Sequence, residues 1–81
     1  MAKTKTFALL VATLTKDGHL LSNLHFEIDC IGSERYVWSE FYKRADGLHY
    51  VDLFDSISAP FARGVNPESG FVEVYRIQQI N

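Results

Sequence analysis

Residues 7–30 read FALLVATLTKDGHLLSNLHFEIDC, two apolar runs separated by Asp17-Gly18. An Asp-Gly pair in this position predicts a β-hairpin, because the type I′ turn requires positive φ at both of its central residues. With a two-residue turn at Asp17-Gly18, Lys16 faces His19, and the facing pairs continue outward along both strands from there. The sequence therefore predicts a strand over residues 6–15 paired with a strand over residues 20–31.

The two faces of this predicted hairpin differ in character. Three facing pairs on one face consist of large apolar side chains, and they are Phe7 with Ile28, Leu9 with Phe26 and Val11 with Leu24. The other face mixes apolar with polar side chains, and it carries Ala8, Leu10, Ala12, Leu14, Leu21, Asn23, His25 and Glu27. A slip of one residue would exchange the faces, so the pattern itself supports the register.

The next segment, SERYVWSEFYKRADG over residues 33–47, has the pattern of an amphipathic helix. At about 100° per residue its apolar side chains fall in one arc, and they are Val37, Trp38, Phe41, Tyr42 and Ala45. Ser33 is a favourable N-cap, and Gly47 follows the last turn. The alternative is a hairpin that turns at residues 45–47, which would make the protein an all-β meander or small barrel.

Three further segments complete the chain. Residues 48–54 have apolar side chains on both faces, which predicts a strand in the centre of a sheet. Residues 55–70 contain both prolines and two of the five glycines, so we expect a long loop. Residues 71–78 form the last predicted strand.

The resulting order, β-β-α-β-loop-β, predicts an α+β fold. We expect a single domain over residues 1–81, with a four-stranded, mainly antiparallel sheet and one helix on one face. A single helix covers only one face of such a sheet, and we expect it to cover the face that carries Phe7, Leu9, Val11, Leu24, Phe26 and Ile28. The second face, and in particular Leu10, Ala12, Leu14 and Leu21, is therefore a candidate dimer face.

The composition limits the classes of function. The 81 residues have a net charge of −2 and are 47% hydrophobic, with both signs of charge dispersed, so nucleic acid is an improbable partner. Cys30 is the single cysteine, which excludes an internal disulfide and suits the cytoplasm. No apolar stretch reaches the length that crosses a membrane.

Searches for catalytic and metal-binding patterns yield no candidate. His25, Glu27 and Asp29 alternate along one strand, but Ala8 and Leu10, which face them, supply no further ligand, and a metal needs three or four. The chain has no nucleophile motif and no glycine-rich phosphate loop. We therefore expect no catalytic residues, no metal and no cofactor.

What remains is recognition of a protein partner of unknown identity. Phe61 and Arg63 lie between the two prolines, and Arg35, Tyr36 and Lys43 lie on the polar face of the helix. We expect a small, non-enzymatic regulator or inhibitor, one form of which is a phage or mobile-element protein that blocks a host machine. Alternatives are a small nucleic-acid-binding domain, or an enzyme or ligand binder with its site at a dimer interface.

Overall fold

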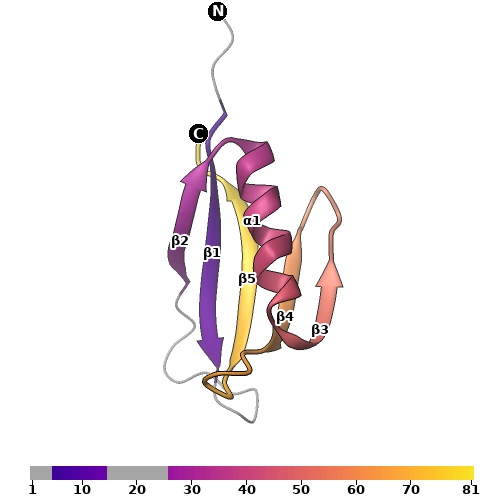
Figure 1. The fold of residues 1–81 in the computed structure, drawn as a ribbon. Helices are drawn as coiled ribbons and strands as arrows, with labels where there is room; N and C mark the ends of the chain where they lie inside the picture. The colour runs from indigo at the N-terminus through magenta and orange to yellow at the C-terminus, as the bar shows by residue number, and fades with distance from the viewer. Residues whose placement is uncertain (1–4, 15–25) are drawn as a thin grey trace, which may run out of the picture.

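A computed structural model describes residues 5–14 and 26–81. Within these residues the chain forms five strands and one helix, in the order β1 (Phe7–Leu14), β2 (Glu27–Gly32), α1 (Glu34–Asp46), β3 (His49–Phe54), β4 (Phe61–Val65) and β5 (Val72–Gln79). The strands make one antiparallel sheet in the order β2-β1-β5-β4-β3 (Figure 1). The predicted α+β class is confirmed, and the described sheet has one strand more than predicted.

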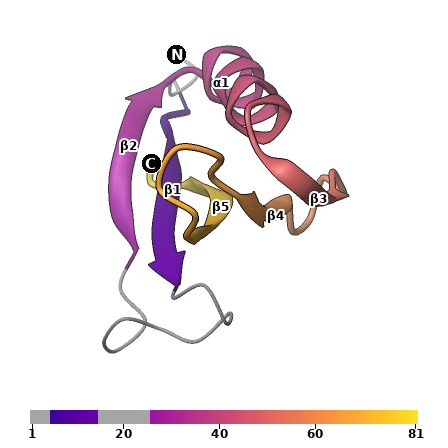
Figure 2. The same cartoon turned by 60° about the horizontal axis from the view of Figure 1, so that its bottom comes forward.

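The core lies between α1 and one face of the sheet, whose centre is the β1–β5 pair. Figure 2 shows the helix on one side of the strands. The main apolar cluster contains residues from the helix and four of the strands or their ends, and its buried members are Phe7, Leu9, Val37, Phe41, Ala45, Leu48, Ala62 and Tyr75. The prediction that α1 covers Phe7, Leu9 and Val11 is thus confirmed.

The helix forms where its local signals predict it. The Ser33 side chain accepts a hydrogen bond from the Tyr36 backbone N–H at 3.2 Å, which satisfies one of the free donors of the first turn. Lys43 and Arg44 lie in the last turn, where positive charge is favourable. The all-β alternative for this segment is wrong.

The predicted register of the hairpin is wrong in the part that the structure describes. Leu9 faces Cys30 rather than Phe26, and the register shifts at a β-bulge between Leu9 and Leu10. The extra residue is Asp29, which accepts a hydrogen bond from Arg44 of α1 at 2.9 Å. The bulge thus re-aims one carboxylate toward the helix. The predicted turn at Asp17-Gly18 lies outside the described residues.

This shift moves Phe26 and Ile28 away from the helix. Ile28 faces Leu10, and Phe26 packs in a second apolar cluster on the far face of the sheet. We use "far face" for the side of the sheet opposite α1. The buried members of this cluster are Leu14, Val72 and Val74. The prediction that Phe26 and Ile28 lie under the helix is therefore wrong.

The predicted loop over residues 55–70 contains a strand, β4. Its side chains alternate, with Ala62 and Gly64 buried on the helix side and Phe61, Arg63 and Val65 on the far face. Pro60 precedes the strand, where a missing N–H is tolerated. Because β4 pairs between β5 and β3, β3 becomes an edge strand, and its predicted central position is wrong.

Candidate protein-binding surface

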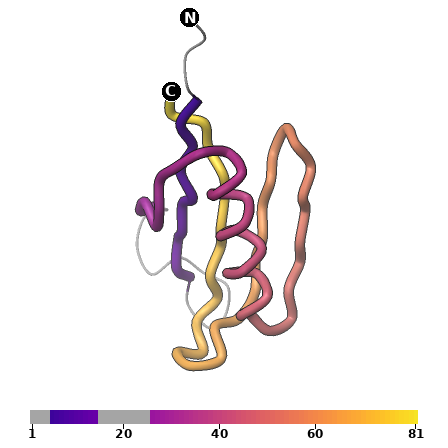
Figure 3. Tube along the Cα trace, turned by 45° about the horizontal axis from the view of Figure 1, so that its top comes forward, coloured from indigo at the N-terminus to yellow at the C-terminus, as the bar shows by residue number. Residues whose placement is uncertain are grey.

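Strand β3 and the turn that follows it carry four large apolar side chains that are exposed to solvent. Tyr50 and Ile57 are each 89% exposed, Phe54 is 58% exposed and Leu53 is 43% exposed. Figure 3 shows the β3–β4 hairpin beside the helix at the edge of the sheet. We call Tyr50, Leu53, Phe54 and Ile57 the β3 surface.

A β-bulge sets the shape of this edge. His49 faces Val65 and Asp52 faces Arg63, so two residues of β3 lie opposite the single residue Gly64. One of them, Tyr50, has φ of 55°, which costs a non-glycine residue about 1–2 kcal/mol. A strained backbone at an exposed position is typical of binding sites.

Gly64 is required by the close approach of this bulge. A Cβ added to Gly64 would lie 2.8 Å from the Leu48 Cβ and 3.0 Å from the His49 carbonyl oxygen. Any larger residue would push the start of β3 away from β4. The sequence therefore positions Tyr50 through a glycine on the neighbouring strand.

Between α1 and β3 lies a groove of about 580 Å³. Most of its lining is apolar, and the lining residues are Tyr42, Lys43, Ala45, Asp46, Leu48, Val51 and Leu53. The Tyr42 hydroxyl donates to Asp55 at 3.2 Å, which connects the helix with the segment after β3. Desolvation and this hydrogen bond raise the pKa of Tyr42, so it stays a neutral donor at neutral pH.

The far face carries apolar side chains of its own. Phe54 and Phe61 contact each other with ring centroids 5.8 Å apart, and the guanidinium of Arg76 lies 5.2 Å from the centroid of the Phe26 ring. Ile28 and Ile31 of β2 both face β1 residues of this side, and both are exposed. The bulge at Asp29 brings these two isoleucines, three positions apart, to one face.

The residues that the sequence predicted for protein binding do not come together. Phe61 is half-buried against the far-face cluster and Arg63 is exposed on that same face. Arg35 and Tyr36 are exposed on the first turns of α1, and the Tyr36 ring lies against Gly32. Lys43, near the other end of the helix, forms an ion pair with Glu40 at 3.2 Å.

The predicted dimer face is largely covered within the chain. Ala12 and Leu14 are buried, Leu10 is half-buried, and Leu21 lies outside the described residues. Ile28 and Ile31 of β2 are exposed apolar residues of this face, and the register predicted from the sequence gave no indication of them.

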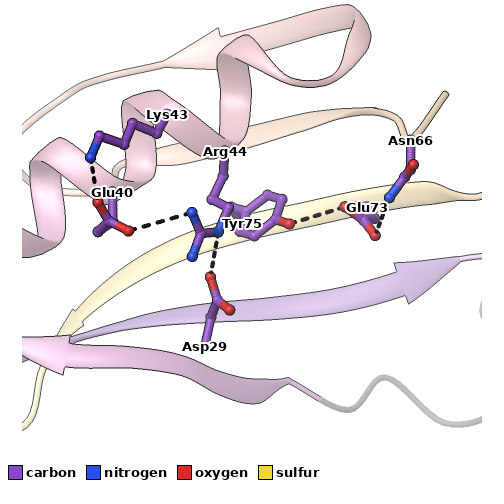
Figure 4. A network of polar contacts seen from close by, with 7 residues as sticks. All are labelled: Asp29, Glu40, Lys43, Arg44, Asn66, Glu73 and Tyr75. Carbon is purple, nitrogen blue, oxygen red and sulfur yellow. Dashed lines mark hydrogen bonds and ion pairs between the residues drawn. The ribbon is translucent and has the colours of Figure 1, made fainter. Parts of the chain in front are cut away.

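The charged groups beneath the helix form a structural network (Figure 4). Arg44 contacts Asp29 at 2.9 Å and Glu40 at 3.4 Å, which connects α1 with β2. The Tyr75 hydroxyl donates to Glu73 at 3.0 Å, and the Asn66 amide donates to the other oxygen of Glu73 at 3.1 Å. These contacts hold the β4–β5 turn and the helix in place.

Burial alters the acidity of two groups near this network. Desolvation, the hydrogen bond to Glu73 and the nearby carboxylates raise the pKa of Tyr75. Desolvation followed by the charges of Asp29 and Glu40 raises the pKa of the Cys30 thiol, so this cysteine is not activated as a nucleophile. Within residues 5–14 and 26–81, no three His, Cys, Asp or Glu side chains are arranged to hold a metal.

The β3 surface was not predicted from the sequence, because residues 48–54 were expected to form a central strand. Ile57 between Ser56 and Ser58 was the available signal, since a large apolar residue in a polar turn has no strand partner to cover it. α1, the helix of the described part, lacks the length and apolar character that a membrane crossing needs. Searches of protein-family models, curated proteins and solved structures found no match to this chain.

Proposed function

We propose that this protein is a non-enzymatic protein-binding domain that recognises its partner through the β3 surface. The observation that carries this proposal is the exposure of Tyr50, Leu53, Phe54 and Ile57 within eight residues of an edge strand and its turn. Exposed apolar side chains gathered along one edge of a sheet are typical of sites of protein contact.

The residue types support the same conclusion. Aromatic side chains act as anchors at interfaces, because they bury a large area at a small cost in conformational entropy. Phe54 contacts Phe61 on one side of β3, and Leu53 borders the groove on the other side. A partner that covers this edge would therefore bury apolar side chains on both sides of the strand.

The distribution of positive charge disfavours nucleic acid as the partner. Lys43 and Arg44 of α1 are paired with carboxylates, Arg63 faces Asp52 across the ladder, and the whole chain has a net charge of −2. A nucleic-acid surface requires cations gathered on one face beside the stacking aromatics. We place the protein in the cytoplasm as a regulator or inhibitor that acts by occupying a partner's surface.

A photo-crosslinking experiment tests the proposal. A benzoylphenylalanine at position 50 should crosslink to one discrete partner in extract of the source cells, and excess unlabelled chain should compete. The same group at Arg35, an exposed position on α1, is the matched control. The same products from both positions, or no competition, would contradict binding through the β3 surface.

A second candidate is self-association through β2, favoured by the exposure of Ile28 and Ile31 on one face. Light scattering of the purified chain measures this directly. A dimer that becomes a monomer on Ile28→Glu, but not on Tyr50→Ala, would support this candidate.

A further inference from the structure

We propose that the outer edge of β3 binds an extended, basic segment of the partner as an added β-strand. In this arrangement alternate apolar side chains of the segment enter the groove between α1 and β3. The inference rests on the proposed function, because it names how the β3 surface recognises its partner.

The first argument is the free edge of β3. Among the described strands β3 pairs with β4 on one side and with no strand on the other, so its outer backbone groups are available. Such an edge is a template for another strand, and recognition by strand addition combines backbone hydrogen bonds with pockets for alternate side chains.

The second argument is the groove on the helix side of that edge. Leu53 faces Ala62, which lies in the main cluster under α1, so Leu53 and Val51 point to the helix side. A strand added beside β3 would lie about 4.8 Å away and point every second side chain to that same side. Tyr42, Ala45 and Leu48 would receive these side chains.

The third argument is charge. Residues 45–60 contain three carboxylates, Asp46, Asp52 and Asp55, and no lysine or arginine, although the whole chain has eight basic and ten acidic residues. Lys43, which borders the groove, is paired with Glu40, Arg44 is paired with Asp29 and Glu40, and Arg63 faces Asp52 across the ladder. Complementarity therefore favours lysine or arginine in the added segment.

The same carboxylates disfavour a second copy of this chain as the occupant. Antiparallel pairing of β3 with its own copy would bring together two acidic edges, and facing like charges destabilise a sheet. The carboxylates of this edge therefore disfavour pairing with a second copy of the chain and favour pairing with a strand that carries lysine or arginine.

Display of random octapeptides against the full chain is the first test. Selected peptides should carry Val or Ile at alternate positions and Lys or Arg between them. Sequences with no alternation, or with acidic residues, would overturn the inference.

A selected peptide is then synthesised in two N-methylated forms. Methylation of alternate amides along one edge of an extended peptide removes the hydrogen bonds of that edge and leaves those of the other. Methylation of the pairing edge should weaken binding by at least about tenfold, and methylation of the outer edge by less than about twofold. Equal affinities of both forms, measured by calorimetry, would show that the backbone of the peptide does not pair.

Substitution of carboxylates tests the charge argument. The double variant Asp52→Asn and Asp55→Asn should weaken the peptide several-fold and reduce its salt dependence; asparagine at 55 still accepts from Tyr42. Glu27→Gln, at an exposed position on β2 at the opposite edge of the sheet, is the control and should leave affinity unchanged. Equal loss in both variants would contradict a local role of these aspartates.

The outcomes separate this inference from the proposed function. Crosslinking from position 50 without any edge-selective peptide means that the β3 surface binds its partner by side chains alone, which overturns strand addition. Absence of crosslinking together with absence of peptide selection overturns both. A dimer in solution that Asp52→Lys abolishes or strengthens would show that a second copy occupies this edge, and would also overturn the inference.

Discussion

Strands β1 and β3 are both rich in apolar residues, FALLVATL and HYVDLF, but the fold treats them differently. β1 lies between β2 and β5, with α1 over one face and the far-face cluster on the other. Among the described strands β3 has one neighbour, β4, and all of its residues except Val51 are exposed. The position of a strand in the sheet therefore decides whether its apolar side chains form core or remain available to a partner.

This difference separates the residues that stabilise the protein from those that we propose bind its partner. Substitutions on the covered side should change the free energy of unfolding, and substitutions on β3 should change binding with little effect on unfolding. The following predictions test that separation, beginning with the largest expected effect.

Phe41→Ala should lower the free energy of unfolding by about 3–5 kcal/mol, because Phe41 is fully buried between α1 and β1. Urea denaturation followed by circular dichroism measures the change, and Phe41→Leu provides a milder variant if the alanine variant does not fold. Leu53→Ala on β3 should cost less than about 1 kcal/mol. Similar costs at both positions would remove the distinction between the two regions.

Gly64→Ala should destabilise the protein by about 1–3 kcal/mol, because its Cβ would overlap Leu48 and the His49 carbonyl. The NMR chemical shifts of the backbone amides should change mainly along β3, and partner binding at the β3 surface should weaken as well. Gly47→Ala is the matched control, since its φ is −82° and its Cβ would meet no atom closer than 3.6 Å. Shifts confined to β5 would contradict the role given to Gly64.

Ser33→Ala should cost about 1 kcal/mol by removing the N-cap of α1. Thermal or chemical denaturation measures this loss. Ser39→Ala, at an exposed position within the helix, should change stability by less than about 0.5 kcal/mol. A cost at Ser39 equal to that at Ser33 would mean that the hydroxyl of Ser33 does not act as a cap.

Alkaline pH should reveal the contribution of the buried Tyr75 to stability. Because the folded state raises the pKa of Tyr75, its contribution to stability is fully present below about pH 10, the ordinary tyrosine value, and declines as the pH rises further. Tyr75→Phe should flatten the pH dependence of the unfolding free energy in this range. An unchanged slope in Tyr75→Phe would place the responsible group elsewhere.

Tyr50→Gly should have the smallest effect on stability and one of the largest on binding. Glycine relieves the strain of the positive φ but adds freedom to the unfolded chain, so the net change should remain within about 1 kcal/mol. Loss of the aromatic side chain should reduce crosslinking from a neighbouring probe at position 54. Retained partner binding would argue against Tyr50 as an anchor.

The sequence predicts those parts of the fold that depend on nearby residues. The helix followed from a periodic apolar arc with Ser33 and Gly47 at its ends, all of it local information. The register of β2 did not follow, because the bulge at Asp29 accompanies a contact with Arg44, which lies on a later element. No local pattern encodes such a contact.

The other wrong predictions, the loop over residues 55–70 and the central position of β3, arose because β4 was not recognised as a strand. Strand β4, Phe61–Val65, was not predicted because it is short and lies between Pro60 and Pro67. Its small residues Ala62 and Gly64 are also common in loops. Gly64 is small because Leu48 and His49 pass close to it, and Ala62 is fully buried in the main cluster under α1. Without β4, β3 could not be recognised as an edge, and the candidate site on it could not be predicted.

The central place of β5 has a consequence for how this protein is made. β5 is the last strand, yet it pairs along its whole length with β1, the first. During translation the sheet therefore cannot assemble around its centre until residues 72–79 have left the ribosome. The complete sheet therefore forms only after β5 has been synthesised. The high sequence separation of the β1–β5 contacts also predicts slow folding for so small a chain. A nascent chain arrested before residue 72 should remain protease-sensitive.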